Sequence, residues 1–284
     1  MGLDAIYQFK PDKQGEPGEV GIKYKAEDKF SKLILNEITS IPSELKIDQF
    51  IFTGDKEKNE RFTATIFSLT DSLFKANSHR KEYKTKLKIF EKKFRRSLYN
   101  DSNKKNLDIT SNPLELVSDF DGFLTQIKAS LDNLACGLNP LLETNFNRWA
   151  KGGKDNKSGA KIINHLKNLH RQITIDNLIE YLDKTQDQIT YIVNLRDKPL
   201  HKGGNNNLSG FVFHHNNRNI SRPAIKHPDG HQEEIGDYID KTMQNFILFT
   251  SKVILFGIQH NAKTGFTIRR VSVPNGDTQY EWSL

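Results

Sequence analysis

The stretch "PLELVSDFDGFLTQIKASLDNLACGLN", residues 113–139, decides the fold of this chain. Its apolar residues recur at steps of three and four, which places them on one face of an α-helix. That face consists of Leu116, Phe120, Phe123, Ile127, Leu131, Leu134 and Leu138. Pro113 suits the first turn of a helix, and the "NP" pair at 139–140 predicts its end. The pattern therefore predicts one long helix in the core.

The sequence on both sides of this helix is also helical in pattern. Residues 174–197 have an apolar face of their own, formed by Ile175, Leu178, Ile179, Leu182, Ile189, Ile192 and Val193. Further helices are expected at 27–41, 60–98, 160–170 and 237–258. The polar "ANSH" at 76–79 marks a point at which the second of these could divide in two. The fold class predicted by these patterns is mainly α.

Two segments change to short alternating runs between turn residues, as β-hairpins do. Residues 203–235 form the first and are predicted to be an inserted hairpin region. Residues 263–284 form the second, and the Asn-Gly pair within them predicts a tight turn. Hairpins are thus expected both inside the helical part and at its C-terminal end.

The polar run "NDSNKKNLDITSN", residues 100–112, is the best candidate for a domain boundary. It predicts an N-terminal region, 1–105, composed of an extended segment and a basic helical region. The segment rich in Lys, Gly and Pro at 1–28 is the part expected to be extended. Residues 106–284 would form the helical domain that contains both hairpins.

The positive charge of the chain is concentrated in one place. Between Lys75 and Lys105 twelve Lys or Arg residues stand against three acidic residues, an excess larger than the whole chain's net charge of +7. Tyr83, Leu87, Phe90, Phe94 and Leu98 provide the buried face of the same helix. The opposite face either binds a polyanion, with Arg95 and Arg96 as RNA-binding residues, or is an ordinary solvated surface.

Several classes of function are disfavoured by composition and motifs. A single cysteine excludes an intramolecular disulfide, and Lys252 interrupts the apolar run at 245–258, so we expect a cytoplasmic chain with no membrane contact. The Gly- and Lys-rich stretch "RWAKGGKDNKSGAK" at 148–161 lacks Walker spacing. In "HPDGH", Pro228 and Gly230 prevent a helical pair of histidines, so neither a metal nor a cofactor is expected.

The end of the helix at 174–197 carries the residues with the clearest chemistry, in "NLRDKPLH" at 194–201. Arg196 follows Val193 by one turn, which predicts that it lies on the apolar side and needs a partner. Pro199 should end or kink the helix, so that His201 can face Arg196. An arginine that holds a phosphate beside a histidine that moves protons suits cleavage of RNA through its own 2′-hydroxyl.

Two alternatives to this interpretation follow from the residues themselves. Arg196 could instead be a structural arginine at a helix end, with Asp132 of the long core helix either orienting it or neutralising it. The segment "RPAIKH", Arg222 to His227, has the same Arg-to-His spacing in a turn-rich region. Spacing alone therefore does not distinguish a site from a coincidence.

The stretch "NLRDKPLH" at the end of a long amphipathic helix resembles the Arg-x4-6-His motif of the HEPN superfamily. The resemblance covers about residues 110–262 and includes "ASLDNLACGLN", residues 129–139. It implies an up-and-down helical bundle, here with an N-terminal helical extension, and a metal-independent endoribonuclease of the kind found in toxin or phage-defence systems. Pro199 within the motif departs from the common pattern.

The resemblance also implies roles for individual residues. Arg196 would bind and stabilise the phosphate, His201 would transfer protons, and Asp197 would position one of them, while Lys198 and Lys202 would add contacts to the RNA backbone. HEPN ribonucleases often dimerise with their motifs face to face, so the expected partners are RNA, a second copy of the chain, and an inhibitory or activating protein. The alternative function is a non-catalytic HEPN-like module that binds RNA, a nucleotide or a protein.

Overall fold

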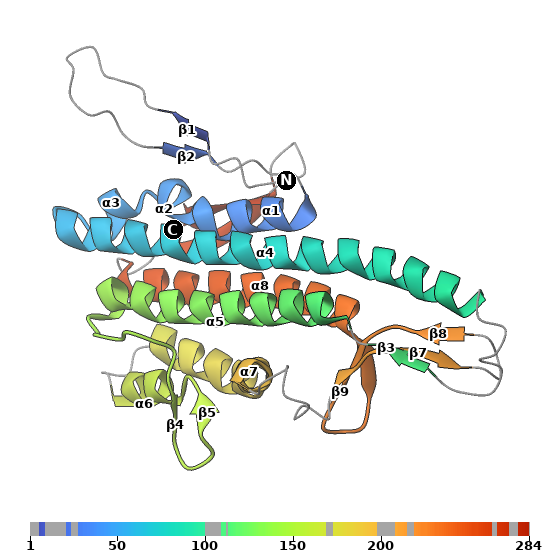
Figure 1. Ribbon diagram of the computed structural model, residues 1–284. Coiled ribbons are helices and arrows are strands. Elements are labelled where there is room, and N and C mark those ends of the chain that lie inside the picture. Colours follow the sequence, from blue (N-terminus) through green and yellow to red (C-terminus); the bar gives the residue numbers. More distant parts are fainter. Residues whose placement is uncertain are drawn as a thin grey trace.

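The computed structural model describes residues 6–8, 21–23, 28–99, 109–111, 113–168, 173–197, 208–214, 219–262, 266–272 and 278–283. The described part is mainly helical, as the sequence predicted (Figure 1). The helices are α1 (Lys29–Ile34), the π-helix η1 (Leu35–Thr39), α2 (Ile41–Glu44), α3 (Ile47–Phe50), α4 (Lys56–Tyr99), α5 (Leu114–Leu142), α6 (Ala160–Asn168), α7 (Ile173–Asp197) and α8 (Ile235–Asn261).

The strands form small antiparallel sheets at the edges of the helical body. β1 (Ile6–Gln8) pairs with β2 (Gly21–Lys23), and β4 (Lys151–Gly152) pairs with β5 (Lys157–Ser158). The inserted region contributes β6 (Leu208–Ser209), β7 (Phe211–His214), β8 (Asn219–Ser221), β9 (Ala224–Lys226) and β10 (Gln232–Glu234). Short β3 (Ile109–Ser111) joins β7, and β11 (Thr267–Ser272) pairs with β12 (Thr278–Ser283). The strands of both predicted hairpin regions are therefore confirmed, whereas the Asn-Gly turn at 275–276 lies outside the described residues.

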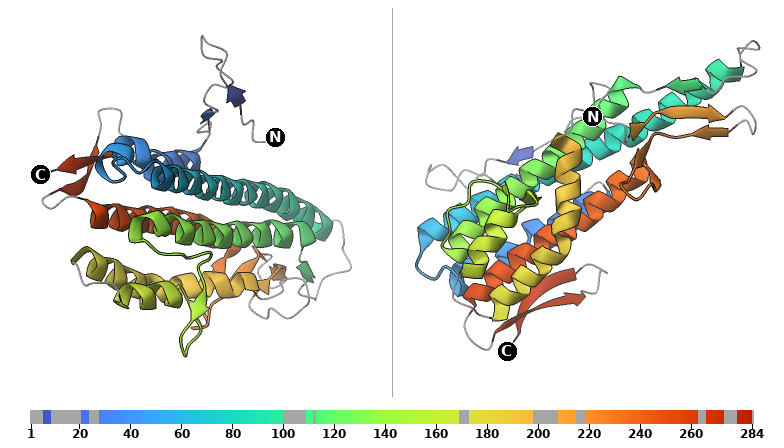
Figure 2. Two further views of the ribbon diagram at one scale, coloured as in Figure 1. Left: turned by 90° about the vertical axis from the view of Figure 1, so that its left-hand side faces the viewer. Right: turned by 90° about the horizontal axis from the view of Figure 1, so that it is seen from below.

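Three long helices, α4, α5 and α8, form the centre of the molecule (Figure 1). The start of α8 packs against the last third of α4, where Gly236 faces Leu87 and Tyr83. The ends of α8 and α5 meet where Gly257 faces Leu141. It follows that α8 runs parallel to α5 and antiparallel to α4, and α7 covers the other side of α5 and α8 (Figure 2).

One hydrophobic core includes residues from both sides of the predicted boundary. It extends from Phe30 of α1 to Tyr280 of β12, and the predicted stripes of the helices at 113–139 and 174–197 both contribute to it. Burying this apolar surface is the main source of stability in such a bundle. The proposed division at residue 105 itself lies outside the described residues.

Two helices continue past positions at which the sequence allowed a break or predicted an end. α4 continues without a break through the "ANSH" segment, because Asn77 makes hydrogen bonds to α1 and Ala76 is fully buried. α5 continues past the "NP" pair to Leu142, with Pro140 inside its last turn. Asn139 stabilises this end, since its side chain accepts from Phe146 N and donates to Phe146 O, both at 2.7 Å. Tertiary contacts thus outweigh local propensity at both positions.

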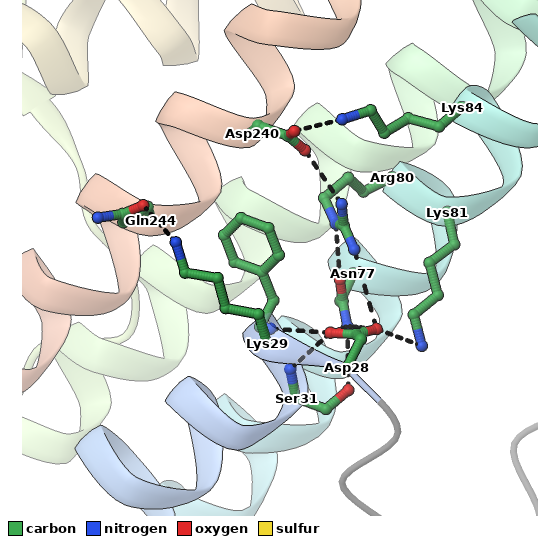
Figure 3. A network of polar contacts seen from close by, with 10 residues as sticks. Asp28, Lys29, Ser31, Asn77, Arg80, Lys81, Lys84, Asp240 and Gln244 are labelled. Atoms are coloured by element: carbon green, nitrogen blue, oxygen red, sulfur yellow. Dashed lines mark hydrogen bonds and ion pairs between the residues drawn. The ribbon is translucent and has the colours of Figure 1, made fainter. Parts of the chain in front are cut away.

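A polar network attaches the N-terminal helices to the centre (Figure 3). Asp28 caps α1 by accepting from Phe30 N and Ser31 N at 2.8 and 2.9 Å. Arg80, only 9% exposed, donates to Asn77 Oδ1 at 2.8 Å and to Asp240 Oδ1 at 3.0 Å. A buried arginine is tolerated only when its donors are satisfied. The network therefore fixes the relative positions of α1, α4 and α8.

The remaining elements position the loops around α7. α6 and the β4–β5 hairpin pack against α7. The region from β6 to β10 lies beside the C-terminal end of α4 and the N-terminal end of α5 (Figure 1). Among the described residues, none of the helices combines the length and apolar character needed to cross a lipid bilayer.

Candidate functional site

The last turn of α7 exposes Arg196 to solvent. Its side chain is 43% exposed, whereas the neighbouring Leu195 is 2% exposed and belongs to the core. The prediction that Arg196 lies on the apolar side of the helix and not on the solvent side is therefore wrong. The length of the side chain is the physical reason, because an arginine can leave an apolar stripe and carry its guanidinium into water.

Arg196 belongs to a cluster of polar side chains at this helix end. Its Nη1 donates to Asp197 Oδ1 at 3.3 Å. Lys151 of β4 donates to Asp197 Oδ2 at 2.5 Å and to Asn194 Oδ1 at 2.9 Å. With two cations and one carboxylate, the cluster of Lys151, Asn194, Arg196 and Asp197 carries a net positive charge.

The charge of Asp197 is stabilised by its neighbours. Partial burial raises the pKa of this carboxyl, but the hydrogen bonds and charges of Lys151 and Arg196 outweigh burial and leave the pKa below its usual value of 3.8. A lowered pKa means that the stabilisation is complete above pH 3.8 and is lost as the pH falls through the lower value in the folded state. Asp197 is therefore ionised at neutral pH.

Lys151 reaches the cluster because of the loop that follows α5. Asp132 of α5 accepts from Trp149 N at 2.7 Å and pairs with Lys128 at 2.5 Å. The role of Asp132 is thus to orient the segment that leads to Lys151, and Arg196 pairs with Asp197 instead. On the other side of the hairpin, Ser158 N donates to Thr190 Oγ1 of α7 at 2.9 Å.

Substitution of Gly159 by alanine should disturb this loop. Gly159 has φ +78°, and an added Cβ would lie 2.5 Å from Nε1 of the buried Trp149. We expect a loss in the free energy of unfolding of about 2–4 kcal/mol, since left-handed strain and overpacking each cost about 1–3 kcal/mol. Urea denaturation measures the loss.

Gly153 in the same hairpin is the matched control for that substitution. Its φ is +74°, but an added Cβ would meet nothing within 4 Å. Gly153→Ala should therefore lower the free energy of unfolding only by the cost of backbone strain, about 1 kcal/mol. Equal losses in the two variants would contradict the view that contact with Trp149 holds the loop in place.

Several predicted site residues lie in a part of the chain without a structural description. His201, Lys198 and Lys202, together with Pro199, fall within residues 198–207, outside the described residues. The helix ends at Asp197, directly before that segment. The roles assigned to these residues remain predictions.

The segment with the same spacing, Arg222 to His227, does not form an Arg/His pair. Arg222 is bound by Glu91 at 3.0 Å and by Glu234 at 3.3 Å, whereas His227 lies 3.2 Å from Glu233. Glu233 and Glu234 are adjacent in β10, and adjacent residues of a strand point to opposite faces. Arg222 and His227 therefore lie on opposite faces of their hairpin.

The described histidines of the inserted region have structural contacts. His227 packs on Tyr191 and on His231, with ring centroids 5.3 and 5.6 Å apart, and His214 Nε2 lies 2.8 Å from Ser221 Oγ. Within the described residues, no group of three or more His, Cys, Asp or Glu is arranged to hold a metal ion. His215 lies outside the described residues.

The basic face of α4 is exposed near its C-terminal end. Lys88, Lys92, Lys93, Arg95 and Arg96 point to solvent, while Tyr83 and Leu87 are buried as predicted. Arg95 donates to Glu91 at 2.8 Å, one helical turn away. Phe94 packs against Phe211 of β7 with ring centroids 5.7 Å apart, so this end of α4 is held by the inserted region.

Comparison of the chain with models of protein families, with curated proteins and with solved structures gives no significant match.

Lys151 is the site residue that sequence reasoning missed. The only local signal is the Gly- and Lys-rich stretch at 148–161, which lacks the spacing of a phosphate loop and does not point to Asp197. Lys151 and Asp197 are far apart in sequence, and only the packing of the β4–β5 hairpin on α7 brings them together.

Proposed function

We propose that this protein is a metal-independent endoribonuclease of HEPN type, in which α5, α7 and α8 correspond to the helical bundle of that superfamily. One observation carries the proposal: Arg196 is exposed at the end of α7, in a cluster with a net positive charge, directly before the segment that contains His201. An exposed cationic cluster of this kind attracts a phosphodiester.

The exposed position of Arg196 favours a role in binding phosphate. Its contact with Asp197 at 3.3 Å joins adjacent residues in water, a type of ion pair that contributes little to stability. A phosphate can replace this contact and accept two hydrogen bonds from the guanidinium. Lys151 keeps Asp197 ionised and in place while Arg196 turns to the RNA.

The proposed reaction combines Arg196 with His201, which lies outside the described residues. His201 takes the proton of the 2′-hydroxyl, and the oxygen attacks the adjacent phosphorus while Arg196 stabilises the charge on the non-bridging oxygens. The bond to the 5′-oxygen breaks, and that oxygen leaves with a proton from a second copy of the motif in a homodimer. The products are a 2′,3′-cyclic phosphate and a 5′-hydroxyl. Lys198 and Lys202 contact the flanking phosphates.

The direct test is a pair of single-stranded oligonucleotides with one sequence, one of RNA and one of DNA, incubated with the protein in EDTA. We expect cleavage of the RNA alone, because DNA lacks the attacking hydroxyl. Cleavage of both strands would exclude the 2′-hydroxyl as nucleophile. Binding of RNA without any cleavage would favour the alternative, a non-catalytic RNA-binding module.

The basic face of α4 supports RNA binding in either function. A variant with Arg95→Gln and Arg96→Gln should bind RNA more weakly, and the slope of log affinity against log salt should fall by about 1.4, or about 0.7 per lost phosphate contact. Filter binding at several salt concentrations gives the slope.

Arg61→Gln is the control for this experiment. Arg61 lies near the opposite end of α4 and pairs with Glu57 at 2.5 Å, just as Arg95 pairs with Glu91. The control should bind RNA as the parent does. If its slope falls as much as that of the double variant, binding depends on overall charge and not on the predicted face.

A further inference from the structure

A pocket of about 420 Å³ lies between α8 and the C-terminal hairpin β11–β12. It is separate from the proposed RNA site. Lys252 in its wall lies 4.4 Å from the ring of Tyr181, which precedes Arg196 on α7 by fifteen residues, or roughly 22 Å of helix. Figure 2 shows the C-terminal hairpin beside the end of α8, away from the C-terminal end of α7.

A buried carboxylate forms the polar end of the pocket. Glu37 of η1 is 2% exposed and is bound by Arg270 of β11. Tyr280 of β12 donates to Glu37 Oε2 at 2.5 Å, and Ser251 of α8 lies 3.3 Å from the same oxygen. Burial, followed by the hydrogen bond to Glu37, raises the pKa of Tyr280, so its hydroxyl keeps its proton. The charge of Glu37 is thus neutralised inside the fold.

Lys252 supplies a second cation to the pocket. Its ammonium lies over the rings of Tyr181 and Phe256, at 4.4 and 5.9 Å from their centroids. No carboxylate among the described residues forms an ion pair with it. Since Glu37 and Arg270 cancel, the lining carries one positive charge. An anion is the ligand that this charge attracts.

The rest of the lining is apolar. Leu248, Leu255 and Phe256 come from α8, and Ile268 comes from β11. Gln259 is already engaged, because its amide donates to Phe266 O at 2.6 Å and accepts from Ile268 N at 2.9 Å. An apolar wall with a few placed polar groups and a volume of a few hundred Å³ is typical of sites for small molecules.

We propose that this pocket binds a small organic monoanion with an apolar body, such as a medium-chain carboxylate. The anionic group pairs with Lys252 at the mouth, and the apolar body lies along Leu255, Phe256 and Ile268. The ligand then bridges α8 and the C-terminal hairpin, which it stabilises by binding the folded state only. The site requires neither RNA binding nor cleavage.

Isothermal titration with decanoate, below its micelle-forming concentration, tests the proposal. Decan-1-ol has the same chain without the charge and should bind at least about tenfold more weakly, as expected for one lost charged hydrogen bond. Lys252→Met keeps most of the apolar stem and should reduce decanoate affinity by about the same factor. Lys241→Met is the control, because Lys241 lies on the same helix but pairs with Glu233 outside the pocket.

The outcomes separate the possibilities. One decanoate per chain, weakened by Lys252→Met and unchanged by Lys241→Met, supports the site. Equal binding of decanoate and decan-1-ol, or no binding of either, overturns it. Phosphatidylglycerol vesicles form a second arm: co-sedimentation that depends on Lys252, without binding of free decanoate, would indicate a lipid surface and contradict a soluble ligand.

Discussion

Arg196→Ala should lower kcat/KM for RNA cleavage by about 10²–10³-fold, the usual cost of removing one group that stabilises developing charge in a transition state. The fold should not change, because the side chain is 43% exposed and its one described partner is the adjacent Asp197. Arg196→Lys should recover only part of the rate, since an ammonium cannot bind a phosphate through two parallel hydrogen bonds.

The exposed position of Arg196 makes this prediction easy to interpret. Circular dichroism and the urea midpoint of Arg196→Ala should match those of the parent, so a lower rate reports the loss of the guanidinium and not of the structure. Arg61→Ala removes an exposed arginine outside the site and should leave the rate unchanged. If Arg196→Ala cleaves RNA at the parental rate, Arg196 is only a surface residue of the helix end.

The second large effect concerns stability. Arg80→Met should reduce the free energy of unfolding by about 3 kcal/mol, the lower end of the cost of breaking a buried ion pair. Asn77 Oδ1 and Asp240 Oδ1 both lose their donor, and the guanidinium no longer lies over the ring of Phe30, 4.3 Å away. The loss stays at the lower end because Lys84 still pairs with Asp240 (Figure 3).

Lys84→Met is the matched variant for Arg80. Lys84 pairs with the same Asp240 but is 36% exposed, so its removal should cost about 0.2–1 kcal/mol. Urea denaturation of both variants gives the comparison. Similar small losses for the two would mean that the network in Figure 3 does not fix α1 to α4 and α8.

The long helices were predictable because their apolar residues repeat with a clear period. The stripes from Leu116 to Leu138 and from Ile175 to Val193 lie in the core as expected. The unbroken helix at Asn77 was not predictable from a local window, because the contact with Asp28 comes from 49 residues away. The helix end at Pro140 was not predictable for another reason: Phe146 is only seven residues from Asn139, but its contact with Asn139 depends on how the loop folds back on the helix.

The candidate site was predictable only in part. "NLRDKPLH" identified Arg196 and Asp197 at a helix end, and the structure brings these two together. The apolar side of the helix was predicted for Arg196 from its angular position, which takes no account of side-chain length. Lys151 could not be identified from the sequence, because it lies 46 residues before Asp197 and only the folded β-hairpin places the two side by side.

The most direct test of the central claim is to map the ends of RNA cleaved in EDTA by the parent and by His201→Ala. We predict 2′,3′-cyclic or 3′-phosphate ends and 5′-hydroxyl ends from the parent, and a rate about 10²–10⁴-fold lower from the variant, which lacks the proton-transfer group. Equal cleavage by both proteins, or products with 3′-hydroxyl and 5′-phosphate ends, would contradict an Arg/His ribonuclease.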